Sequence, residues 1–74
     1  MLYKATEFDA ATLIATGRKR FFEAPSAKRA ADRLAEFERA DGRAAVVGEN
    51  GKSVFSGSVA YAVTLPEKFP RDVI

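Results

Sequence analysis

The sequence predicts an α+β domain in which a mainly antiparallel sheet of four to five strands carries one helix on one face. Three observations lead to this prediction. The stretch from Ser26 to Asp41 has the apolar period of a helix, strand-like segments flank it on both sides, and an Asn50-Gly51 pair separates two of these segments. The expected element order is therefore β-β-α-β-β-β, with the second face of the sheet open to water or to a partner.

The helix is amphipathic. One arc of its helical wheel is mostly alanine, with Leu34 and Phe37 as the large apolar side chains and Glu38 as an interruption, and the opposite arc is charged. Because alanine is small, the helix can lie close to a sheet. We expect Leu34 and Phe37, the large apolar side chains of the arc, to anchor it there. Ser26 is the expected N-cap, and Gly42 the expected left-handed residue after the last turn.

The segment before the helix predicts two strands. Residues 2–8 form the first, and residues 19–24 form the second, which leads into the helix. Between them, residues 12–16 are rich in β-branched side chains, which favours a strand or an extended loop. The alternative is a short helix that Asp9 would cap.

The segment after the helix contains the clearest hairpin signal. Residues 44–49 and 52–56 are strand-like and flank Asn50-Gly51, a pair that favours a type I′ turn because both central residues need positive φ. Gly57-Ser58 then predicts a bulge or a bend. These features place two paired strands directly after the helix.

The last strand-like segment, residues 59–65, alternates regularly between larger and smaller side chains. Pro66 and Pro70 follow it and should break regular structure. We therefore expect one domain over residues 1–65 and a C-terminal tail over residues 66–74.

Composition excludes several classes of function. The chain is 47% hydrophobic and 30% charged, as in folded proteins, and it contains neither cysteine nor histidine. Disulfides and a serine–histidine triad are therefore excluded, and a zinc or copper site is disfavoured. There is no export-signal pattern and no apolar run long enough to span a bilayer, so we expect a cytoplasmic protein without membrane contact.

No stretch carries the pattern of an enzyme. The segment from Gly48 to Ser53 offers glycines, a lysine and a serine, but it lacks the spacing of a phosphate-binding loop and lies in a hairpin. Ten carboxylates are present, yet nothing brings two of them into an apolar pocket. We therefore expect no catalytic residues, no cofactor and no metal.

Positive charge gathers in the middle of the chain and points to a binding surface. Residues 18–43 carry eight basic and five acidic residues, and a basic triplet directly precedes Phe21-Phe22. If one sheet face is covered, one of these two rings must point outward, where arginines and aromatic rings anchor interfaces. The candidate partner-binding residues are Arg18, Lys19, Arg20, Phe22, Lys28, Arg29 and Arg33.

The expected partner is a protein or a nucleoprotein complex. The alternative is a nucleic acid, bound by the basic and aromatic residues between Arg18 and Arg33. Asp32, Glu36 and Glu38 lie among the helix arginines and weaken the positive field, which makes nucleic acid the secondary choice. A homodimer also fits, because a chain of this size buries only a thin core.

The junction from Phe21 to Ala31 reads FFEAPSAKRAA. A strand ending in Glu-Ala, a serine cap and an Ala-Lys-Arg helix opening, followed by a strand and an Asn-Gly hairpin, resembles the layout of some small phage-encoded inhibitors of CRISPR complexes. The resemblance covers about residues 19–57 and does not include Pro25 or the Arg18–Arg20 run. It implies a non-catalytic cytoplasmic inhibitor that docks on a nucleoprotein complex, and it transfers no functional residue.

Overall fold

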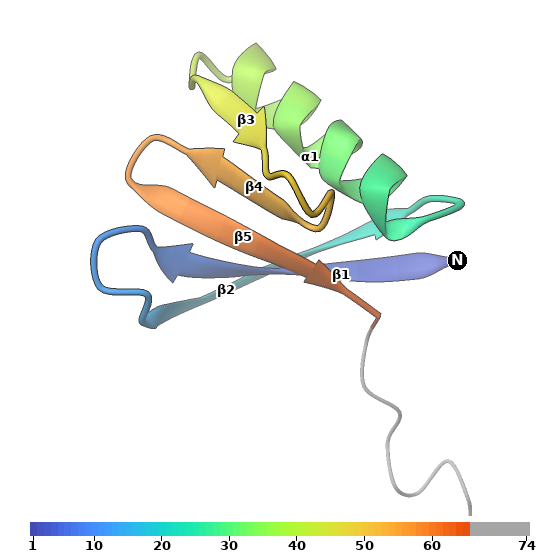
Figure 1. Ribbon diagram of the computed structural model, residues 1–74, viewed down its shortest axis with the longest axis horizontal. Helices are drawn as coiled ribbons and strands as arrows, with labels where there is room; N and C mark the ends of the chain where they lie inside the picture. Colours follow the sequence, from blue (N-terminus) through green and yellow to red (C-terminus); the bar gives the residue numbers. More distant parts are fainter. Residues whose placement is uncertain (66–74) are drawn as a thin grey trace, which may run out of the picture.

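The computed structural model describes residues 1–65, which form a five-stranded antiparallel sheet with one helix on one of its faces (Figure 1). The order β-β-α-β-β-β confirms the fold class expected from the sequence. The elements are β1 (Leu2–Asp9), β2 (Ala15–Glu23), α1 (Ala27–Ala40), β3 (Ala45–Val47), β4 (Ser53–Ser56) and β5 (Val59–Thr64). The expected C-terminal tail, residues 66–74, lies outside the described residues. No helix within residues 1–65 has the length and apolarity needed to cross a membrane.

The strands do not follow their chain order across the sheet. Their spatial order is β2-β1-β5-β4-β3, and every neighbouring pair is antiparallel. The last strand, β5, therefore lies in the centre, between β1 and β4. The nine-residue β2 and the three-residue β3 form the two edges, so β2 is by far the longer free edge of the sheet.

The helix begins and ends as the sequence predicts. The Ser26 hydroxyl accepts a hydrogen bond from the Arg29 N–H at 3.2 Å. At the other end, Gly42 has φ +91° and donates to the Arg39 carbonyl, while the Arg43 N–H donates to the Glu38 carbonyl. This pair of bonds is the Schellman arrangement, which needs a left-handed residue at the position of Gly42.

The core lies between α1 and the sheet. Ala30, Ala31, Ala35 and Leu34 of the helix are fully buried against side chains such as Val54 and Val63. The prediction that Phe37 anchors the helix was wrong, because 57% of its surface is exposed. The buried arc runs through Ala30, Ala31, Leu34, Ala35 and Glu38. Phe37 lies at the margin of this arc and contacts the ring of Phe22 on β2 instead.

The two hairpin turns differ from the sequence prediction. Within residues 1–65, Leu13 is the only non-glycine residue with positive φ, so Asn50 does not adopt the conformation of a type I′ turn. Gly48 instead pairs with Ser53 across a four-residue loop, because the Asn50 carboxamide oxygen accepts from the Lys52 N–H and the Ser53 hydroxyl. The loop residues themselves therefore set the longer turn.

The tight turn lies at Gly57-Ser58, where a bulge or bend was expected. Ser56 and Val59 are paired directly across it, and Gly57 has φ +61°. Positive φ at the first central residue belongs to a type II′ turn, which glycine accepts without strain. This turn brings β5 back alongside β4.

The ambiguous segment between β1 and β2 is a turn followed by strand. The Asp9 carboxylate accepts from the N–H groups of Ala11 and Thr12 at 2.9 and 3.0 Å, and these bonds lower the pKa of Asp9. Asp9 thus stabilises a turn and does not start a helix. β2 begins at Ala15, earlier than the expected residue 19, because it pairs with β1 along most of its length, with one irregularity between Thr6 and Phe8.

Candidate functional site: the β2 edge and the groove beside α1

β2 presents one side of its backbone to solvent. It pairs with β1 alone, and just beyond the strand the Ala24 N–H donates to the Met1 carbonyl at 2.9 Å. In an antiparallel ladder, the residues whose N–H and C=O groups point to the neighbour alternate with residues whose groups point away. From the register, the residues whose backbone groups face outward are Lys19, Phe21 and Glu23.

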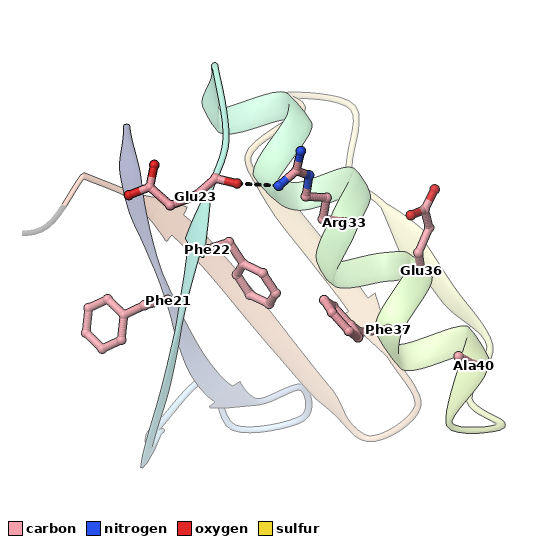
Figure 2. Close-up of a pocket in the computed structure, with 7 residues that line it drawn as sticks. All are labelled: Phe21, Phe22, Glu23, Arg33, Glu36, Phe37 and Ala40. Atoms are coloured by element: carbon pink, nitrogen blue, oxygen red, sulfur yellow. Dashed lines mark hydrogen bonds between the residues drawn. The ribbon is translucent and has the colours of Figure 1, made fainter.

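An apolar groove runs between β2 and α1 (Figure 2). Its volume is about 580 Å³. Phe22 and Phe37 point toward each other from the strand and the helix, with ring centroids 5.6 Å apart. The Arg33 guanidinium spans the groove at one end and donates to the Glu23 carbonyl. The residues that line the groove are Phe21, Phe22, Glu23, Arg33, Glu36, Phe37 and Ala40.

The two adjacent phenylalanines lie on opposite faces of the sheet. Phe22 pairs with Tyr3 and points toward the helix, whereas Phe21 pairs with Lys4 and is 54% exposed. The expectation that one ring points outward is thus met by Phe21. With Phe37, the groove region displays two large aromatic rings that are more than half exposed.

A second concave region, the polar cleft, lies beside the groove, toward the other end of β2. Its deepest charged group is Glu38, which is only 1% exposed although it sits on the apolar arc of the helix. Its carboxylate accepts from the Ser56 hydroxyl at 2.8 Å and pairs with Arg20 at 3.3 Å and Arg43 at 3.5 Å. Two arginines and a hydroxyl therefore compensate its burial.

Glu7 is the second buried carboxylate of the polar cleft. The Thr16 hydroxyl donates to it at 2.6 Å and the Tyr61 hydroxyl at 2.9 Å. The bond from Thr16 is the main cause that lowers the pKa of Glu7, against the opposing effect of burial. Burial, and then the bond to Glu7, raise the pKa of Tyr61 to about 12. The polar cleft has a volume of about 570 Å³, and most of the polar side chains that line it already bond to one another; Arg18 also lines it and is in no ion pair within residues 1–65.

The structure separates the candidate residues of the basic triplet. Arg18 and Arg20 line the polar cleft on the helix side, and Arg20 is held by Glu38. Lys19 pairs with Thr6 and lies on the opposite face of the sheet. Of the three triplet residues, Arg18 and Lys19 take no part in the ion pairs found within residues 1–65.

The remaining candidate residues also lie apart from one another. Phe22 and Arg33 meet at the groove. Lys28 pairs with Asp32 at 3.2 Å on the helix, and Arg29 is exposed beside it. The seven candidates therefore form no single patch, and the groove joins only two of them. Phe37 and Glu38 were missed as site residues, although Glu38 left a signal as the one charge within an apolar arc.

Among residues 1–65, no group of three or more acidic side chains is arranged to hold a metal ion. No family model matches the chain, and no curated protein and no solved structure is significantly similar to it. Function must therefore be inferred from the geometry of this chain.

Proposed function

We propose that the protein acts without catalysis, by binding another protein through the edge of β2 and the groove beside α1. The observation that carries this proposal is the nine-residue edge strand, whose backbone groups at Lys19 and Phe21 face away from β1, directly beside a groove with exposed aromatic rings. Edge strands bind extended peptides by adding a strand, and neighbouring pockets select the side chains. Aromatic residues and arginine are also the types that dominate binding energy at interfaces.

The polar cleft supports a structural role instead. Glu38 and Glu7 are buried and bonded to side chains of the same chain, and Arg20 and Arg43 are engaged by Glu38. A ligand in this cleft would have to replace bonds that already exist. The groove requires less exchange, because Phe21 and Phe37, two of its three phenylalanines, are more than half exposed to water.

Inhibition of a nucleoprotein complex, the role implied by the resemblance, is one form that such binding could take, and we include it in the proposal. The second candidate is direct binding of a nucleic acid. It is favoured by one observation, namely that Lys19 and the exposed ring of Phe21 lie on the same face of β2. Arg20 weakens this candidate, because its charge is held by Glu38.

The test is affinity capture of a partner from a lysate of the native host, with and without nuclease. We expect the wild-type chain to retain a protein partner after nuclease treatment. The double variant Phe21→Ala, Phe37→Ala should lose it. Phe55→Ala is the matched control, because Phe55 is 50% exposed but lies on β4 and does not line the groove.

Two results would contradict the proposal. Loss of all capture after nuclease would assign the function to nucleic-acid binding. Loss of the partner in Phe55→Ala, with binding retained in the Phe21→Ala, Phe37→Ala variant, would move the contact away from β2 to the region around Phe55 on β4.

A further inference from the structure

We infer that the partner is held as an extended segment that adds to β2 as a sixth strand, with acidic residues opposite Arg18 and Lys19 and apolar residues opposite Phe21-Phe22. This inference rests on the proposed function and specifies the chemistry of the partner. It is carried by the direction of the backbone groups, the order of the side chains along β2 and the position of Arg33.

The backbone groups define where the added strand lies. The N–H and C=O of Lys19 and Phe21 face outward, whereas the Glu23 carbonyl already accepts from Arg33. Arg33 therefore limits the added strand at the Glu23 end. The segment would extend from Phe22 toward Ala15, past the part of β2 in which every side chain is exposed, residues 15–21.

The side chains define what the segment carries. On the helix side of β2, Arg18 and Arg20 are followed by Phe22, and on the open side Lys19 is followed by Phe21. Cross-strand neighbours on the same face interact, and opposite charges or apolar pairs are favoured. An added strand would thus place carboxylates beside Arg18 and Lys19, the two triplet cations outside the ion pairs of residues 1–65, and apolar side chains beside the phenylalanines on both faces.

The groove extends this preference on the helix side. A side chain of the added strand that lies beside Phe22 also meets Phe37 and Ala40 of α1. An aromatic or aliphatic anchor fits there, because the lining at this point is apolar. Arg18 and Lys19 have no ion-pair partner within residues 1–65, so an acidic segment supplies charges that the described chain does not.

A second copy of this chain fits the edge less well. Antiparallel self-pairing centred on Lys19 would set the three cations against the same three cations. Self-pairing centred on Phe21 would match Lys19 with Glu23, but it would require the Glu23 carbonyl that Arg33 occupies. It would also leave Arg18 and Arg20 without carboxylates from the partner copy. Charge complementarity therefore favours an acidic partner segment over a dimer.

Two variants at one residue test strand addition on the protein side. Lys19→Pro removes an outward N–H without breaking the bonds between β1 and β2, a position where an edge strand accepts proline. Lys19→Ala removes the charge and keeps that N–H. Circular dichroism and thermal unfolding would confirm that both variants fold.

The probes are fluorescently labelled synthetic peptides of about eight residues, a length that covers one strand. One pool joins an acidic half to an apolar half, in both orders, and a matched pool carries Lys and Arg in place of the acidic residues. We expect the acidic pool to bind at least about ten-fold more tightly than the basic pool. Lys19→Pro should weaken binding by about ten-fold or more, and Lys19→Ala by only about two- to five-fold.

Backbone methylation of the best peptide tests the same inference without changing the protein. Two peptides are compared, one methylated on its odd-numbered and one on its even-numbered backbone nitrogens. Only one of them should bind, because only every second N–H of an added strand faces β2 and methylation of these groups removes the hydrogen bonds. Equal binding of the two methylated peptides would overturn strand addition, and this result would hold even if Lys19→Pro failed to fold. Equal binding of the acidic and basic pools would overturn the assigned charge.

These outcomes are separable from failure of the proposed function. If a protein partner were captured but no acidic peptide bound, the inference would be wrong and the proposed function would stand. If no protein partner were captured, the proposed function would fail, whatever the peptides did. A wild-type dimer in sedimentation that Lys19→Pro dissociates would assign the edge to a second copy and overturn the inference.

Discussion

Arg20 and Phe22 are neighbours on the same face of β2, yet they belong to regions of opposite character. Arg20 enters the polar cleft, where it pairs with the buried carboxylate of Glu38 at 3.3 Å. Phe22 enters the groove, where its main aromatic contact is Phe37, a ring that is itself 57% exposed. In the polar cleft the buried polar groups have partners within the chain, whereas in the groove large apolar surface remains in water.

This difference indicates which region is structural and which is free to bind. Burial of charge is tolerated only where hydrogen bonds and opposite charges compensate it, so the polar cleft ties β1, β2, β4, β5 and the helix end together. Exposed aromatic rings beside an open strand edge make no such contribution, and their burial becomes favourable when a partner arrives. Stability and binding should therefore respond differently to substitutions in the two regions.

The largest expected effect is the loss of Glu38. Glu38→Ala should lower the free energy of unfolding by roughly 3 kcal/mol, because it leaves a cavity and removes the partner of Ser56 and of two arginines. Arg20 and Arg43 are about half exposed, so water can solvate their charges in the variant. The loss of stability should therefore be smaller than for removal of one partner of a fully buried ion pair. Urea unfolding measures this change in the free energy of unfolding. The control is Glu36→Ala on the exposed arc of the same helix, and an equal loss in both variants would refute the structural role of the polar cleft.

A smaller effect is expected at Tyr61. Tyr61→Phe removes its hydrogen bond to Glu7 and should cost about 1 kcal/mol at neutral pH. The pKa of Tyr61 is raised from 10.0 to about 12, so its contribution is fully present below pH 10 and is lost as the pH rises from 10 to about 12. Thermal unfolding from pH 9 to 12 should therefore decline less steeply in Tyr61→Phe than in the wild type or in Tyr3→Phe. Parallel pH profiles in all three chains would contradict the raised pKa.

The smallest effect on stability is expected in the groove. Phe37→Ala should cost at most about 1 kcal/mol, since more than half of the ring is already in water. Leu34→Ala, one turn earlier and fully buried, should cost about 3 kcal/mol. Urea midpoints of the two variants provide the comparison. Destabilisation by Phe37→Ala as large as that by Leu34→Ala would make the groove part of the core and would weaken its assignment as a binding surface.

The local elements could be predicted from the sequence because their causes are local. The serine cap, the left-handed glycine and the amphipathic period of α1 each depend on residues within a few positions of one another. The alternation of β5 likewise follows from one strand. The turn at Asn50-Gly51 was predicted wrongly, because the side chain of Asn50 bonds to Lys52 and Ser53 and favours a longer loop over the two-residue turn.

The sequence by itself thus determined the fold class, the order of the elements and the ends of the helix. Only the tertiary structure decided that β2 is an edge, that Phe37 lies outside the core and that Glu38 lies inside it. Glu7 and Tyr61 are far apart in the chain and meet because β5 inserts between β1 and β4. Such pairings depend on contacts between segments that are distant in the chain. These contacts decide both which buried charges are paired and which aromatic rings remain exposed to water.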